Sequence, residues 1–129
     1  MTIYAFVASH RIIDLTTVAL LSNGASSVPE TLKSDTAGQL GVEGSVVLAT
    51  CNRLEVYIKL AVPEHLAPVS ELIFAHIAAQ AGLAQEIVSS SFEVYSDLES
   101  AKHLFTVASG LESAVVGERE IAGQVRRAL

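Results

Sequence analysis

The segment from residue 45 to residue 60 constrains the fold most, because it reads as two β-strands separated by a few polar residues. The run from Ser45 to Thr50 is mostly apolar and predicts a buried strand. From residue 54 to residue 60 the pattern alternates strictly, with Leu54, Val56, Ile58 and Leu60 on one face and Glu55, Tyr57 and Lys59 on the other. This alternation predicts a half-buried strand that runs antiparallel to the preceding one.

Hydrophobic spacing and turn residues predict the elements around this pair. Short apolar runs predict strands at residues 3–8 and 92–95. Helical spacing, together with capping and stop residues, predicts helices at residues 14–21, 29–40, 63–82 and 97–109. We expect a turn or flexible loop at Asn23–Ser27, because Asn-Gly and small polar residues favour turns. The order is typical of an α/β (α+β) fold with a split βαβ, ferredoxin-like antiparallel sheet and additional helices.

Composition narrows the class of protein without identifying its chemistry. The 129 residues suffice for one domain with a real core, and the formal net charge of −6 argues against a free-standing nucleic-acid binder. The single cysteine excludes an intramolecular disulfide, and the first residues lack the basic region of a signal peptide. No apolar stretch approaches the roughly 20 residues of a membrane-spanning helix. These features predict a cytoplasmic protein with no membrane association.

The cysteine lies where the first strand of the pair gives way to polar residues. Thr50, Asn52, Arg53 and Glu55 place a hydroxyl, an amide, a cation and a carboxylate within a few residues of the Cys51 thiol. Rigid support beside clustered polar groups is what a positioned nucleophile needs. Two plainer interpretations stay open: Cys51 could be a buried small hydrophobe, and Arg53 could form a structural salt bridge with Glu55.

The four histidines are candidates for metal ligands and for proton carriers. His10, His65 and His76 show no ligand spacing with one another or with Cys51, so we predict no metal site. We expect His65 and His76 on the exposed side of their helix. His103 falls well away from the apolar stripe of the helix predicted at residues 97–109, which leaves a surface histidine or a site residue.

Three segments carry a resemblance to a known family. Residues 50–57, T-C-N-R-L-E-V-Y, resemble the S-T-C-N-R-T-E-I-Y signature of glutamyl-tRNA reductases, with departures at Ala49 and Leu54. Residues 103–125 resemble that family's H-L-F-x-V-A-S-G-L-x-S-M-V-x-G-E-x-x-I-x-G-Q-V block. Residues 9–11, S-H-R, resemble the start of its N-H-K-T-A-P element, but Ile-Ile-Asp replaces the continuation.

The resemblance implies that residues 1–129 are a single N-terminal catalytic domain that bears the nucleophile and is truncated before an NADPH-binding domain. The Cys51 thiolate would attack glutamyl-tRNA and form a glutamyl thioester, which NADPH would reduce to glutamate 1-semialdehyde in the first committed step of tetrapyrrole (5-aminolevulinate) biosynthesis. The implied catalytic residues are Cys51 and His103. The implied substrate-binding residues are Thr50, Asn52, Arg53, Ser113, Glu118 and Gln124. Helix capping or solvent exposure could also account for the last three.

The resemblance also implies cofactors and partners. NADPH would serve the full-length enzyme, but these 129 residues contain no G-x-G-x-x-G turn, so we expect none bound here. Implied partners are glutamyl-tRNA, a second copy in a homodimer, and a glutamate-1-semialdehyde aminomutase. The alternative from a different class is a non-catalytic α/β module that binds a ligand or partner, with a buried or redox-sensitive cysteine. A sheet-face RNA-binding module is disfavoured, because no exposed aromatic pair or basic stripe supports it.

Overall fold

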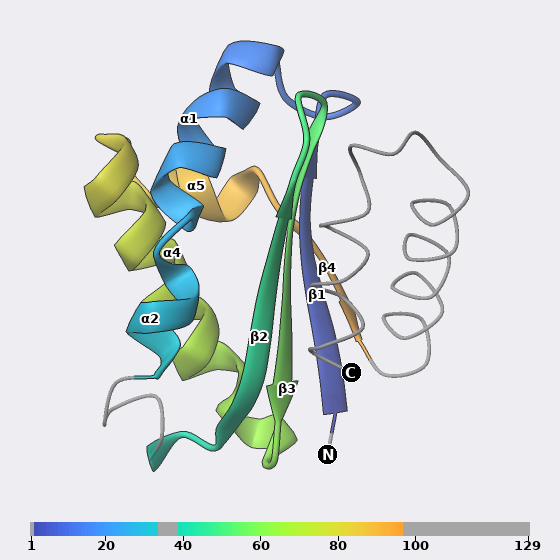
Figure 1. The fold of residues 1–129 in the computed structure, drawn as a ribbon, viewed down its shortest axis with the longest axis vertical. Helices are drawn as coiled ribbons and strands as arrows, with labels where there is room; N and C mark the ends of the chain where they lie inside the picture. Colours follow the sequence, from blue (N-terminus) through green and yellow to red (C-terminus); the bar gives the residue numbers. More distant parts are fainter. Residues whose placement is uncertain (1, 34–38, 97–129) are drawn as a thin grey trace.

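Four strands form an antiparallel sheet in the part of the chain that the computed structural model describes, residues 2–33 and 39–96 (Figure 1). The strands are β1 (Thr2–Ser9), β2 (Val42–Ala49), β3 (Arg53–Leu60) and β4 (Glu93–Ser96). Their order across the sheet is β2-β3-β1-β4, so the two central strands are β1 and β3. The helical elements are α1 (Leu15–Ala25), α2 (Val28–Leu32), η1 (Pro63–His65), α4 (Leu66–Ala81) and α5 (Gln85–Ser90). This β-α-β-β-α-β topology confirms the predicted ferredoxin-like α/β fold.

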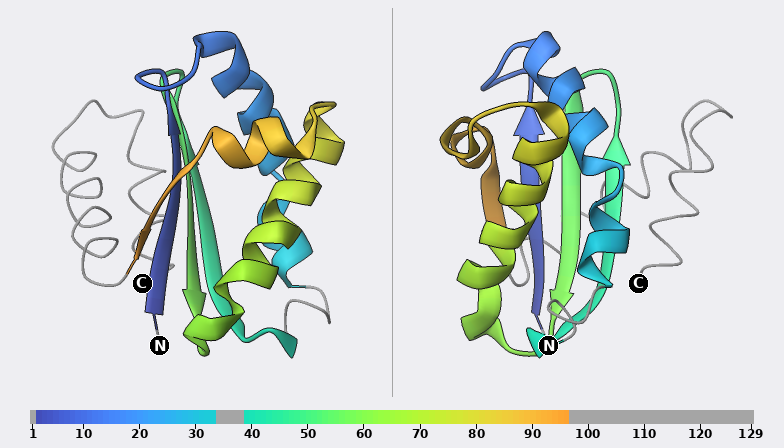
Figure 2. Two further views of the ribbon diagram at one scale, coloured as in Figure 1. Left: turned by 180° about the vertical axis from the view of Figure 1, so that it is seen from behind. Right: turned by 90° about the vertical axis from the view of Figure 1, so that its left-hand side faces the viewer.

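The helices cover one face of the sheet and form the main core with it (Figure 2). Alternate β3 residues, including Val56 and Ile58, point to this face and are buried, as the alternation predicts. Phe6 of β1 contacts Phe74 of α4 edge to face, with ring centroids 5.7 Å apart. The predicted stop of α4 is also confirmed, since Gly82 caps it in the left-handed conformation at φ 70°.

The opposite face of the sheet is less exposed than the alternation predicts. Glu55 and Tyr57 of β3 are buried, so the expectation of a half-buried strand was wrong for both. Tyr57 packs in a smaller apolar cluster with residues of β1 and β2, and Glu55 has a cationic partner in Arg53. A period of two gives the direction of each side chain, but it does not reveal that polar side chains can be buried by pairing.

The turn predicted at Asn23–Ser27 was also wrong in position. Helix α1 continues through Gly24 and ends at Ala25. A Cβ atom on Gly24 would lie 2.8 Å from the backbone oxygen of Ile77, so this glycine allows close packing of α1 on α4. Tertiary packing has overridden the local turn preference of Asn-Gly. The second predicted helix is shorter than expected: α2 ends at Leu32, and residues 34–38 lie outside the described residues.

Two histidines expected on an exposed helix face instead join elements. The His76 imidazole contacts the Ser27 hydroxyl at 2.6 Å and the Thr31 hydroxyl at 3.2 Å, linking α4 to α2. His65 lies in η1, and its Nδ1 contacts the Leu40 carbonyl oxygen at 2.6 Å. Both side chains are part-buried, because other segments of the chain pack against them. Helical spacing alone does not predict where those segments lie.

Two further points concern the predicted elements. Helix α5 was not predicted from the sequence, and the helix predicted at residues 97–109 lies outside the described residues. Among residues 2–33 and 39–96, no helix has the length and apolar character needed to cross a membrane.

Candidate active site

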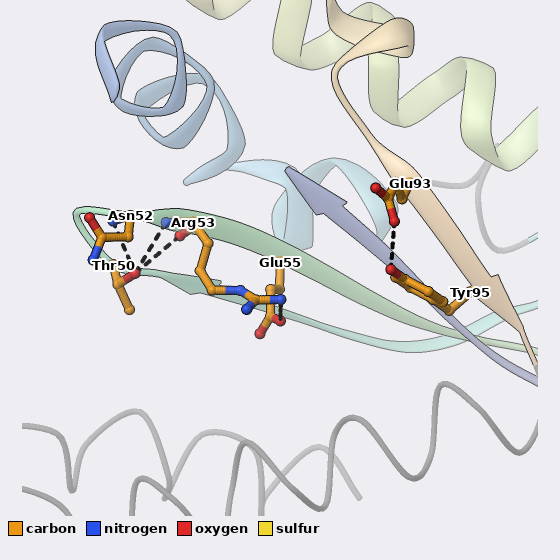
Figure 3. Close-up of polar contacts among 6 residues, drawn as sticks. All are labelled: Thr50, Asn52, Arg53, Glu55, Glu93 and Tyr95. Carbon is orange, nitrogen blue, oxygen red and sulfur yellow. Dashed lines mark hydrogen bonds and ion pairs between the residues drawn. The ribbon is translucent and has the colours of Figure 1, made fainter. Parts of the chain in front are cut away.

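Cys51 is exposed in the short turn that joins β2 to β3. Figure 3 shows Thr50, Asn52 and Arg53 of the same turn. The Thr50 amide donates to the Arg53 carbonyl at 2.9 Å, which closes the turn. The Thr50 hydroxyl accepts from the amides of Asn52 and Arg53 at 3.3 Å and 3.2 Å. Cys51 is therefore held on a hydrogen-bonded turn at the end of two paired strands, and the interpretation of it as a buried hydrophobe was wrong.

A second loop lies against this turn. The His10 amide donates to the Asn52 carbonyl at 2.9 Å, which ties the connection between β1 and α1 to the residue after Cys51. The same connection is folded back on itself, because the amides of Ile12 and Ile13 both donate to the Ser9 carbonyl, at 3.0 Å and 3.1 Å. The segment that resembles the N-H-K element thus forms one wall beside the cysteine turn.

A pocket of about 350 Å³ lies on the sheet face opposite the described helices. Strand register explains its composition, since Ser9 of β1 pairs with Arg53 of β3, and Val7 of β1 pairs with Glu93 of β4. Successive residues on a strand point to opposite faces, so these side chains share one face. Its described lining residues are Val7, Ser9, Arg11, Ile12, Arg53, Glu93 and Tyr95.

Two charged side chains of the pocket, Arg53 and Glu93, have polar partners. The Arg53 guanidinium lies 2.9 Å from the Glu55 carboxylate, with side-chain exposures of 39% and 3% (Figure 3). The salt bridge considered from the sequence is therefore present. Farther along the face, the Tyr95 hydroxyl donates to Glu93 Oε2 at 2.6 Å.

Tyr57 lies next to this ion pair on β3. Burial raises the pKa of its phenol well above the ordinary value, and the charge of Glu55 and a hydrogen bond with it raise the pKa further. The phenol therefore stays protonated across the physiological range.

The structure brings part of the predicted site together. Thr50, Cys51, Asn52 and Arg53 share one turn, and Arg53 reaches the pocket. The Thr50 hydroxyl is occupied by backbone groups of the turn, which is a positioning role. The remaining predicted site residues, His103, Ser113, Glu118 and Gln124, lie outside the described residues.

Sequence reasoning missed four polar residues of the pocket: Ser9, Arg11, Glu93 and Tyr95. A signal existed for the first two, because they belong to the motif-like S-H-R segment. For Glu93 and Tyr95 the only signal was their alternation on a predicted strand. Whether these two side chains lie on the same sheet face as Arg53 depends on the strand register, which the sequence does not specify.

The described residues do not provide a metal site or a dinucleotide-binding turn. Within residues 2–33 and 39–96, no group of three or more His, Cys, Asp or Glu side chains is placed to hold a metal ion. The β1-to-α1 connection contains no glycine, and the two positive-φ glycines of the described part, Gly41 and Gly82, lie in separate connections. The described part therefore does not fit the glycine-rich strand-to-helix turn that holds a dinucleotide pyrophosphate.

Comparison with known proteins gives a consistent result. Residues 7–129 match the family model described as "Glutamyl-tRNAGlu reductase, N-terminal domain". The chain is 50% identical over its whole length to a glutamyl-tRNA reductase of Pseudarthrobacter chlorophenolicus and 48% identical to one of Kocuria rhizophila, covering 29% of each. A solved structure of glutamyl-tRNA reductase from Methanopyrus kandleri matches 98% of the chain with a TM-score of 0.55 and 31% identity, over 27% of that protein. The chain thus spans less than a third of the length of these relatives.

Proposed function

The chain belongs to the family of glutamyl-tRNA reductase N-terminal domains, and from this premise we propose that it is the domain of such a reductase that accepts the glutamyl group. The observation that carries the proposal is the exposed thiol of Cys51 on a hydrogen-bonded turn, two residues from a guanidinium that lines a pocket. A nucleophile held in place beside a charge complementary to its substrate needs little further activation to attack an ester.

The proposed reaction of this domain is an acyl transfer. The Cys51 sulfur forms a bond to the carbonyl carbon of the glutamyl ester, the bond from that carbon to the terminal ribose oxygen breaks, and the tRNA leaves with a proton on that oxygen. The product is a glutamyl thioester on Cys51. Thr50 holds the turn in shape, Asn52 and Arg53 face the bound glutamyl group, and His103 assists the movement of the proton. Ser113, Glu118 and Gln124 complete the proposed substrate site.

The other half of the reaction is assigned to parts of the reductase outside the described residues. NADPH would supply the hydride that releases glutamate 1-semialdehyde for tetrapyrrole biosynthesis in the cytoplasm. Because the net charge of the chain is −6, we propose that this domain grips the aminoacylated end of the tRNA while other parts hold the rest. A homodimer and a semialdehyde aminomutase partner belong to the same proposal.

The test is the Cys51→Ser variant of the whole reductase. An alcohol is far less ionised than a thiol near neutral pH, so formation of glutamate 1-semialdehyde should fall to background while the circular dichroism spectrum is unchanged. Retained turnover in a correctly folded variant would remove Cys51 from the mechanism. A chain that binds glutamyl-tRNA with the same affinity in both forms but never transfers the acyl group would be a binding module instead.

The division of labour has its own test. The 129-residue chain, mixed with glutamyl-tRNA and NADPH, should cleave the ester slowly by way of Cys51 without oxidising the nicotinamide. Absorbance of the reduced cofactor and release of free glutamate are the two readouts. Cofactor oxidation coupled to semialdehyde formation would show that the domain assignment is wrong.

A further inference from the structure

The pocket that Arg53 lines contains a second guanidinium that the proposed function has not used. Arg11 lies in the β1-to-α1 connection and lines the same pocket as Arg53. Its side chain is exposed, and no ion pair joins it to another of the described residues. Glu93 supplies the carboxylate among the described lining residues, and it accepts a hydrogen bond from the Tyr95 hydroxyl.

The two guanidinium groups differ in what they already hold. Arg53 lies 2.9 Å from a carboxylate that is 3% exposed, so its charge is largely balanced by Glu55 before any substrate arrives. A buried carboxylate requires a partner, so Arg53 has a structural task in addition to its proposed contact with the glutamyl group. Arg11 has no such task among the described residues, so its positive charge remains available for a ligand.

Backbone contacts tie the segment that carries Arg11 to the turn that carries Cys51. The neighbouring His10 amide is hydrogen-bonded to the Asn52 carbonyl, and the following residues Ile12 and Ile13 are hydrogen-bonded back to Ser9. The backbone on both sides of Arg11 is therefore fixed relative to the Cys51 turn. A guanidinium carried on a fixed backbone loses less freedom when it binds, and its planar fork suits an oxyanion.

We propose that Arg11 binds an oxyanion of the aminoacyl-RNA substrate and so determines which ester reaches Cys51. This inference rests on the proposed function, since it names a specificity residue for the same site. The oxyanion is either the side-chain carboxylate of the glutamyl group or a phosphate of the terminal nucleotides. A guanidinium binds both through paired hydrogen bonds, and the experiment separates the two sources.

The experiment measures acylation of Cys51 in the 129-residue chain by intact-protein mass spectrometry, as initial rate against substrate concentration. The substrates are glutamyl-tRNA, a small glutamate α-ester that lacks phosphate, and the matching glutamine α-ester. The variants are Arg11→Gln and Arg11→Lys, with Lys33→Gln as the control. Lys33 follows α2 in the helical layer, so that variant changes net charge equally without touching the pocket.

For Arg11→Gln we expect the half-saturating concentration of glutamyl-tRNA to rise roughly 10- to 100-fold, the range for a lost charged hydrogen bond, with the maximal rate nearly unchanged. Arg11→Lys should fall between this variant and the wild type. If the oxyanion is the carboxylate, the small glutamate ester suffers the same loss and its preference over the glutamine ester disappears. If it is a phosphate, the small esters react as before and only the tRNA substrate is affected.

Two results would overturn the inference while leaving the proposed function intact. The first is an equal half-saturating concentration for Arg11→Gln and wild type on every substrate. The second is a rise in the half-saturating concentration of Lys33→Gln as large as that of Arg11→Gln. A wild-type chain that forms no adduct on Cys51 with glutamyl-tRNA would instead contradict the proposed function. Thermal unfolding of each variant checks that an exposed substitution has left the fold unchanged.

Discussion

At the scale of single residues, Arg53 and Glu55 combine structural and functional demands. Glu55 is almost fully buried on the sheet face opposite the helices. Arg53 forms an ion pair with Glu55 and also lines the pocket. A substitution of Arg53 therefore affects the fold as well as any substrate that binds there. Measurements of stability separate these two effects.

We expect Arg53→Met to lower the free energy of unfolding by roughly 1–3 kcal/mol, because it leaves a buried carboxylate without its cation. Adding Glu55→Met should recover part of that loss, since both charges are then removed. Urea unfolding followed by circular dichroism gives the values, and Arg11→Met should differ from wild type by less than about 0.5 kcal/mol. Equal losses for Arg11→Met and Arg53→Met would contradict the structural role of the ion pair.

Tyr57 makes stability depend on alkaline pH. Its pKa in the folded state is raised, chiefly by burial and then by Glu55, so the folded chain keeps this proton after the unfolded chain has lost it. This contribution is fully present below the unfolded pKa of about 10. As the pH rises above that value, the free energy of unfolding should fall by up to about 1.4 kcal/mol per pH unit.

The measurement is urea unfolding of wild type and Tyr57→Phe at intervals between about pH 9 and about pH 11, around the unfolded pKa. The variant cannot ionise at this position and should show a smaller slope of stability against pH. Parallel curves for the two proteins would show that Tyr57 does not control the alkaline limit.

At the scale of elements, the contact between α1 and α4 depends on Gly24. An added methyl group would meet the Ile77 carbonyl oxygen at 2.8 Å and the Ala81 side chain at 3.2 Å. Although alanine favours a helix, the clash dominates, and we expect Gly24→Ala to lower the free energy of unfolding by about 1–2 kcal/mol. Gly44→Ala in β2 is the matched control, since nothing lies within 4 Å of its added methyl group.

The control should leave stability unchanged or raise it by up to about 1 kcal/mol, because glycine in a strand has an entropic cost. Both variants can be compared by thermal unfolding under the same conditions. A Gly24→Ala variant as stable as the control would mean that the two helices are less closely packed than the structure shows.

Elements were predictable where one local signal decides them. The period-two pattern of residues 54–60 gave β3, and Gly82 gave the end of α4. The failures occurred where another element decides the outcome, as for the Asn-Gly pair inside α1 and for His76 between α4 and α2. Local propensity is a weak prior in such places, because packing partners distant in sequence outweigh it.

At the scale of the whole molecule, one part of the candidate site is predictable from local sequence and the other part is not. The cysteine turn is contiguous in sequence, so its polar residues could be singled out before the fold was known. The pocket is assembled from β1, β3, β4 and the loop after β1, and its lining depends on strand register. Register is set by turns and by core packing over the whole sheet, which the motif residues alone do not encode.

Intact-protein mass spectrometry tests directly whether Cys51 carries the glutamyl group. The chain is incubated with glutamyl-tRNA without NADPH, quenched in acid, and mapped by proteolysis beside the Cys51→Ser variant. We expect one glutamyl adduct, located on Cys51, removed by hydroxylamine as a thioester would be, and missing from the variant. A wild-type chain without an adduct, or with one that persists at another residue when Cys51 is replaced, would contradict it.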